Sequence, residues 1–190
     1  MATLNTTNIK HASSSSNNIV LAADGSTTIS NLSGGVGKTL QVKQVVKTDT
    51  YSTSSSSFVD ITGMSVSITP SSSSSKVLVQ FHLGTFNNQN NASRAFVQMV
   101  RDSTAICVGD AATGHECSAA VCSRASDDNH TQFPVSMQFL DSPSTTSAVT
   151  YKLQASCGND GGTLYLNRAG TQDAQAGNTA STITVQEVAV

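Results

Sequence analysis

Short runs in which apolar and polar residues alternate recur from about Gly37 onward. The clearest run holds Val149, Tyr151, Leu153 and Ala155, each followed by a polar residue. Successive side chains of a β-strand point to opposite faces, so this period of two predicts a strand with one buried face. The same period predicts strands at residues 64–68 and 77–83. Further strands are expected at residues 40–51, 58–61, 95–101, 135–140, 163–167 and 181–188.

Turn-forming residues separate these runs. They include Thr69-Pro70 followed by five serines, Asp141-Ser142-Pro143, and the Asn-Asp-Gly-Gly segment at 159–162. Gly, Pro, Asn, Asp and Ser favour turns because they adopt or stabilise the required backbone angles. Many short strands with regular turn signals predict an all-β fold, an antiparallel β-sandwich that is jelly-roll-like.

Residues 1–36 differ from the rest because their apolar residues are few and isolated. Residues 19–21 and 27–29 flank Asp24-Gly25, a dipeptide that suits a tight hairpin turn. An isolated hairpin is marginal in water. We therefore expect an N-terminal attachment arm at 1–36, followed by a sandwich domain at 37–190. The residues predicted to dock the arm are Ile9, Ile19, Val20, Leu21 and Ile29.

The composition supports an all-β fold and disfavours two classes of partner, nucleic acids and membranes. Ser, Thr, Asn and Gln supply 77 of the 190 residues, whereas charged residues make up 12% and the formal net charge is −2. Ser, Thr and Asn are mediocre helix formers. No Lys/Arg cluster and no long apolar stretch occurs, so we expect neither nucleic-acid binding nor membrane insertion. The N-terminus lacks the apolar core of a secretory signal, so synthesis in a cytosol is expected.

The segment Ser33-Gly34-Gly35-Val36-Gly37-Lys38-Thr39 resembles the deviant phosphate loop of partition-type ATPases. Such a loop needs a helix whose N–H groups point at the phosphates. The residues that follow, 40–46, are rich in valine and predict a strand instead. A glycine hinge between arm and sandwich is therefore the preferred interpretation.

A zinc site is one interpretation of the cysteines. The chain has four of them, with His115 nearby: Cys107, Cys117, Cys122 and Cys157. Structural zinc prefers close cysteine pairs, and the Cys117 to Cys122 spacing does not provide one. Reduced thiols, mostly buried, are expected in a cytosolic chain. A Cys117–Cys122 disulfide formed after release from a host is the alternative.

No positioned nucleophile or GxSxG motif occurs, although serines are abundant. His82 falls on the polar side of its strand, and His115 and His130 fall in a predicted loop. Asp127, Asp128 and Asn129 lack the spacing of an EF-hand. We therefore expect no enzymatic activity, no cofactor and no metal.

Longer stretches resemble a known family. They are KTDTYSTSSSSFVDITGMSVSITPSSSSSKVLV at 47–79, RDSTAICVGDAA at 101–112, QFLDSPSTTSAVTYKLQA at 138–155 and TASTITVQEV at 179–188. These stretches are similar to small structural proteins and fiber domains of tailed bacteriophages, especially marine and cyanobacterial phages. Residues 113–130 lie outside the resemblance and are interpreted as a variable loop.

The resemblance implies a virion component that is made in the host bacterial cytoplasm. Our first hypothesis is a fiber or knob whose arm docks to other virion proteins while the sandwich contacts a host glycan or protein. The alternative is a capsid decoration or cement protein that bridges capsid subunits. A sugar-binding module or glycan-cleaving enzyme is a third hypothesis, but the chain has nine aromatic residues and no Trp to stack on sugar rings.

Several strands carry apolar residues on their nominal outer face. Leu78, Val97, Met99 and Leu140 stand opposite other apolar residues in the alternating pattern. An exposed apolar patch tends to be covered by a partner. We therefore predict that these four residues lie between subunits of a closed homo-oligomer, and analogy with phage fibers favours a homotrimer.

Overall fold

The computed structural model describes residues 8–9, 19–21, 23, 27–29, 38–88, 94–110, 118, 120–123, 132–157 and 162–190. Every regular element in these ranges is a β-strand, and every strand pair is antiparallel. The predicted all-β class is therefore confirmed. The chain forms two compact units, Met1–Val36 and Gly37–Val190.

The N-terminal unit contains a small three-stranded sheet in the order β1-β2-β3. Its strands are β1 (Asn8–Ile9), β2 (Ile19–Leu21) and β3 (Thr27–Ile29). The predicted hairpin is confirmed because β2 pairs with β3, with Ile19 opposite Ile29. The turn at residues 24–25 lies outside the described residues. Ile9 is exposed and Ile19 and Val20 are half-buried, whereas the side chains of Leu21 and Ile29 fall outside the description.

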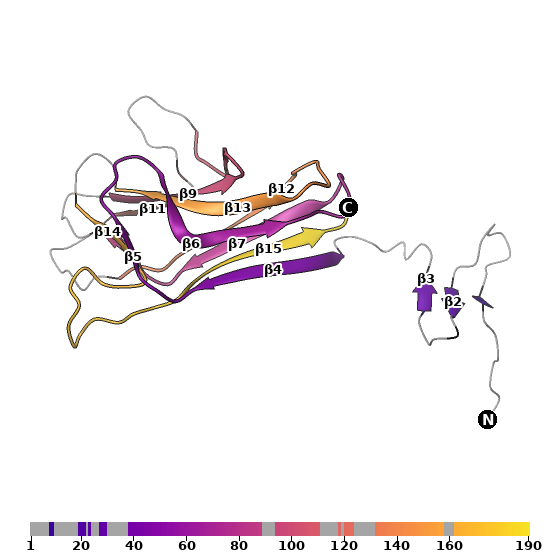
Figure 1. Ribbon diagram of the computed structural model, residues 1–190, viewed down its shortest axis with the longest axis horizontal. Coiled ribbons are helices and arrows are strands. Elements are labelled where there is room, and N and C mark those ends of the chain that lie inside the picture. Colours follow the sequence, from indigo (N-terminus) through magenta and orange to yellow (C-terminus); the bar gives the residue numbers. More distant parts are fainter. Residues whose placement is uncertain are drawn as a thin grey trace. The chain divides into compact units, whose positions relative to one another are not determined.

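Two larger sheets make up the sandwich (Figure 1). Sheet I has the order β12-β7-β15-β4, and sheet II has the order β10-β9-β13-β6, with β11 also paired to β9. The strands of sheet I are β4 (Thr39–Lys47), β7 (Lys76–Leu83), β12 (Val135–Asp141) and β15 (Ser181–Val188). Those of sheet II are β6 (Val59–Ile68), β9 (Arg94–Arg101), β10 (Thr104–Ile106), β11 (Ala120–Ser123) and β13 (Val149–Ser156).

The strand pairing is nested. β9 pairs with β11, β7 with β12, β6 with β13, and β4 with β15, so strands progressively further apart in sequence lie side by side. This is one long antiparallel hairpin folded over on itself. The fold adds the pairs β7–β15 and β9–β13, which complete the two sheets. The result is a jelly roll, in which the first long strand, β4, runs beside the last, β15 (Figure 1).

The core lies between the two sheets and follows the predicted alternation. Val77, Val79 and Phe81 of sheet I are buried, as are Tyr151 and Leu153 of sheet II. Burying a side chain of this size stabilises the fold by roughly 1.5–3 kcal/mol, so this apolar layer drives the association of the sheets. A short third sheet consists of β5 (Tyr51–Thr53), β8 (Phe86–Asn88) and β14 (Leu164–Leu166), in the order β5-β14-β8.

Strand boundaries differ from the predictions in several places. The strands predicted at 58–61 and 64–68 are one strand, β6 (Val59–Ile68), which passes through Gly63 at φ 82°. The predicted segment 40–51 contains β4 and the start of β5. β1, β8 and β10 were not predicted, and β11 lies inside the segment interpreted as a variable loop.

The prediction that Val97 and Met99 face outward is wrong. Both are fully buried in the core, where they pair with Ala155 and Leu153 of β13. The physical reason is that β9 carries apolar residues on both faces, Phe96 and Val100 on one and Ala95, Val97 and Met99 on the other. Since alternation alone cannot choose between two apolar faces, the register with β13 decides which one is buried.

Candidate functional site

The outer face of sheet I combines neutral polar side chains with exposed apolar ones. Its strand registers form three rows that cross the sheet, each with one residue from β12, β7, β15 and β4. The rows are Leu140–Leu78–Gln186–Val42, Gln138–Gln80–Thr184–Gln44 and Ser136–His82–Thr182–Val46. No Asp, Glu, Lys or Arg occupies these rows.

Neutral hydrogen bonds tie this face together. Gln44 Nε2 donates to Thr184 Oγ1 at 2.8 Å, and Gln186 Nε2 donates to Gln80 Oε1 at 2.9 Å. Gln80 Nε2 in turn donates to Gln138 Oε1 at 3.3 Å. These bonds link neighbouring side chains across the four strands of the sheet.

A shallow groove of about 430 Å³ lies on the same face. Its outward-facing lining comes from β7, β12 and β15, and His82 Nδ1 lies 2.7 Å from Ser136 Oγ at one side. The exposed position of His82 agrees with the predicted polar side of its strand. The groove offers amide, hydroxyl and imidazole groups but no fixed charge.

Apolar side chains flank these polar groups. Leu140 is 53% exposed, and Val42 and Val46 are each 54% exposed. Leu78, which is half-buried, lies beside Leu140. Leu78 and Leu140, two of the four residues predicted to form subunit contacts, thus lie on one face, whereas Val97 and Met99 lie in the core.

The outer face of sheet II has a different character. Lys152 Nζ lies 2.8 Å from Asp60 Oδ2, and Gln154 Nε2 donates to Asp60 Oδ1 at 2.7 Å. Hydrogen bonds from Lys152 and Gln154 lower the pKa of Asp60 below its ordinary value. Sheet II therefore presents a charged, hydrated face, whereas the three rows on sheet I are neutral and partly apolar. Lys76 lies on the same side of β7, one row beyond Leu78.

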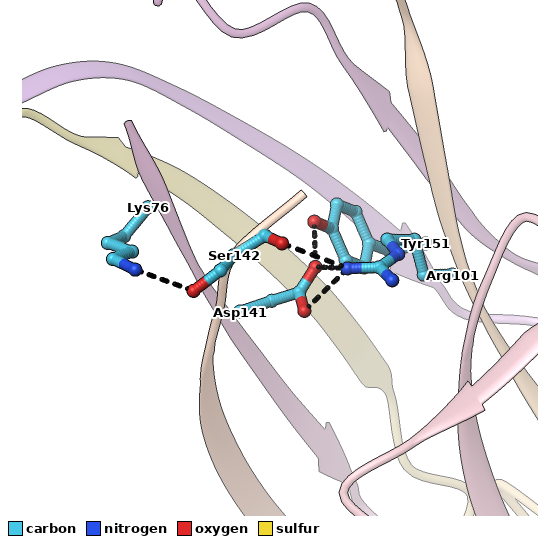
Figure 2. Close-up of polar contacts among 5 residues, drawn as sticks. All are labelled: Lys76, Arg101, Asp141, Ser142 and Tyr151. Atoms are coloured by element: carbon cyan, nitrogen blue, oxygen red, sulfur yellow. Dashed lines mark hydrogen bonds and ion pairs between the residues drawn. The ribbon is translucent and has the colours of Figure 1, made fainter. Parts of the chain in front are cut away.

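A polar cluster joins the two sheets at one edge (Figure 2). Asp141 of β12 is buried and accepts hydrogen bonds from Arg101 Nη1 of β9, at 2.8 Å to Oδ1 and 2.9 Å to Oδ2. Tyr151 of β13 donates its hydroxyl to Asp141 Oδ2 at 2.7 Å. Arg101 also reaches the Ser142 carbonyl at 3.3 Å, and Lys76 Nζ donates to Ser142 Oγ at 2.7 Å.

The geometry of this cluster fits a role in stabilising the fold better than a role in catalysis. Burial, reinforced by the hydrogen bond to Asp141, raises the pKa of the Tyr151 hydroxyl, so that hydroxyl stays protonated and remains a donor. The Asp141 carboxylate is oriented by a cation and a phenol, which fix it in place. The cluster therefore clamps the edge strand β12 of sheet I to sheet II.

Glu187 is a second buried carboxylate. Its Oε1 accepts from Ser71 N at 2.7 Å and Ser71 Oγ at 2.6 Å, and its Oε2 accepts from Gln41 Nε2 at 2.7 Å. Burial opposes the charged form, but hydrogen bonds from Ser71, Gln41 and Ser75 outweigh it and lower the pKa of Glu187 from 4.5 to about 2. Glu187 thus anchors the serine-rich loop between β6 and β7 to β15.

Among the described residues, the chemistry-bearing side chains of the sequence analysis do not form a shared centre. Thr39 begins β4, so a strand and not a helix follows the glycine-rich segment. Cys107 Sγ lies 3.7 Å from Met137 Sδ, and buried Cys157 donates to the Thr53 carbonyl at 3.0 Å. Burial raises the pKa of the Cys157 thiol. His115, Cys117, His130 and the side chain of Cys122 lie outside the described residues, as do residues 127–129.

Within the described ranges, no group of three or more His, Cys, Asp or Glu side chains could hold a metal ion. The same part of the chain has no helix long and apolar enough to cross a membrane.

No protein-family model and no curated protein matches the chain. Among solved structures, it is similar to that of infectious bursal disease virus, Gt strain, at 12% identity and a TM-score of 0.37, with 86% of this chain and 41% of that chain covered. It is also similar to the infectious bursal disease virus VP2 subviral particle, at 15% identity and a TM-score of 0.33, covering 78% of this chain and 39% of that chain. The chain spans about two fifths of the length of these structures, and the similarity is too remote to transfer a function.

Proposed function

We propose that this protein is a structural component of a bacteriophage particle, a fiber or knob that docks by its N-terminal unit and presents the jelly roll to the host surface. The observation that carries the proposal is the combination of a jelly roll, a fold used by viral capsid and lectin domains, with a separate N-terminal unit. Fold alone does not define function, so the surface chemistry must agree with it.

The surface chemistry supports a role outside the cell. The polar surface is built largely from Ser, Thr, Asn and Gln, and charged residues make up only 12% of the chain. Salt screens interactions between exposed charges. A surface with few charges therefore keeps its interactions over a wide range of ionic strength, which suits a particle released into the environment.

Particle composition tests this proposal. Quantitative mass spectrometry of purified phage particles should detect the protein at a fixed copy number, and antibody labelling in electron micrographs should place it on the tail. Labelling over the whole shell, with hundreds of copies, would instead indicate a capsid decoration protein. Absence from washed particles would contradict both roles.

A further inference from the structure

We propose that the outer face of sheet I, made of the three rows defined above, is buried against other copies of this chain. The face would then lie on the symmetry axis of a homo-oligomer. This inference deepens the proposed function, on which its biological setting rests. Its physical basis is the chemistry of the face itself.

The charge distribution selects this face over the opposite one. The outer face of sheet II carries the Lys152–Asp60 ion pair, whose charges would lose hydration if they were buried. The rows on sheet I carry no fixed charge. Lys76 lies on the same side of β7 but one row beyond Leu78, where its Nζ donates to Ser142 Oγ at 2.7 Å. Two copies of a neutral face do not repel each other, whereas a strongly charged partner would find no counter-charge there.

The middle row is complementary to itself. Gln138, Gln80, Thr184 and Gln44 each carry both a donor and an acceptor, because an amide has two N–H groups and a carbonyl oxygen. The bonds along the row use only part of this capacity. An identical face supplies the matching acceptors and donors, so its amides and hydroxyls can be paired when water leaves.

Apolar side chains supply a driving force at both edges of the face. Leu140 lies on the edge strand β12, while Val42 and Val46 lie on the opposite edge strand β4. Four strands about 4.8 Å apart and three rows, each covering two residues at a rise of about 3.3 Å per residue, give a face of about 380 Å² per copy. Stable interfaces bury about 800 Å² per partner. We therefore expect a concentration-dependent oligomer in solution.

The test uses the full chain in sedimentation equilibrium from low micromolar to millimolar concentration. The parent protein should self-associate, and the stoichiometry of the complex is read from the same data. Val42→Glu and Leu140→Glu each place a carboxylate in the proposed interface, and each should lower the association constant at least about 100-fold, since a buried unpaired carboxylate is costly. Both positions are more than half exposed, so the variants should keep the parent circular dichroism spectrum.

Two controls separate charge at this face from charge in general. Val42→Thr keeps the shape and neutrality of the edge, and Ser65→Glu adds the same charge to an exposed position on sheet II. Each control should associate within about threefold of the parent. A parent that stays monomeric at millimolar concentration, or a folded Val42→Glu or Leu140→Glu variant that associates like the parent, would overturn the inference.

Hydroxyl-radical footprinting gives an independent measurement on the unmodified protein. Leu140 should be oxidised in the dilute monomer and protected at high concentration, whereas Val108, which is 41% exposed in the sandwich unit, serves as a reference. Equal oxidation of Leu140 at both concentrations argues against burial of this face. If the protein associates through this face but is absent from phage particles, only the proposed function is refuted. If it is present in particles as an oligomer that forms through a different surface, only this inference is refuted.

Discussion

Asn167 follows β14, is fully buried and has a left-handed backbone with φ 62°. Asparagine tolerates this conformation better than most residues. Its Nδ2 donates to the carbonyls of Lys47 at 2.9 Å and Asp49 at 3.0 Å, and its Oδ1 accepts from Ser181 Oγ at 2.6 Å. One side chain thus joins the end of β4 and the start of β15 to the loop after β14.

We expect Asn167→Asp to destabilise the sandwich by about 3 kcal/mol or more, because the carboxylate oxygen that replaces Nδ2 would face the two carbonyl oxygens and could not donate to them. Urea unfolding followed by fluorescence or circular dichroism measures the change. Asn178→Asp is the matched control at an exposed position and should change the free energy of unfolding by less than about 0.5 kcal/mol. Equal effects of the two variants would mean that the Asn167 hydrogen bonds do not support the fold.

Glu187 should make the free energy of unfolding depend on pH in the acidic range. Its pKa in the folded state, about 2, lies below its ordinary value of 4.5. The carboxylate therefore stabilises the fold fully above pH 4.5, and this contribution is lost as the pH falls from 4.5 toward 2. Glu187→Gln should flatten the pH dependence of unfolding in that window. A parallel decline in parent and Glu187→Gln would assign the acid sensitivity to other groups.

The edge strand β12 is held to sheet II by a polar clamp as well as by core packing. The Asp141 side chain is 7% exposed and that of Arg101 28% exposed, so their interaction is stronger than that of an exposed pair. We expect Asp141→Ala to cost about 3 kcal/mol and Tyr151→Phe about 1–2 kcal/mol. A double-mutant cycle between the two should give a coupling energy of at least about 1 kcal/mol.

The exposed ion pair of sheet II is the control for this clamp. Lys152→Met removes the partner of Asp60, whose side chain is 54% exposed, and should cost less than about 1 kcal/mol. If Lys152→Met and Asp141→Ala lowered the free energy of unfolding equally, the clamp would stabilise the fold no more than an exposed ion pair does.

At the scale of the whole molecule, the two compact units predict separable roles. Residues 37–190 contain both sheets of the sandwich and its entire described core. Deletion of residues 1–36 should therefore leave a folded domain with an unchanged unfolding midpoint, but one that no longer incorporates into particles. Complementation of a phage that lacks the gene, with the full chain as control, measures incorporation. Normal incorporation of the shortened chain would show that the N-terminal unit is not the attachment element.

The sequence by itself determined the strands where one face is apolar and the other polar. β15 was predicted at its observed bounds, and the strands at 77–83 and 149–155 were predicted to within one residue. The reason is that alternation is a local property, set by side chains two residues apart. The hairpin of β2 and β3 was equally local, because the turn-forming pair Asp24-Gly25 lies between its strands in the sequence.

Only the tertiary structure decided which strands pair and which face of a doubly apolar strand is buried. β4 and β15 meet although more than a hundred residues separate them, and no local signal encodes that contact. The outer face of sheet I likewise forms only when the strands pair, because that pairing brings Val42, Leu78 and Leu140 from three strands distant in sequence into one row. Val97 and Met99 were misplaced for the same reason: burial in β9 depends on the register with β13, which is a property of the assembled sheet.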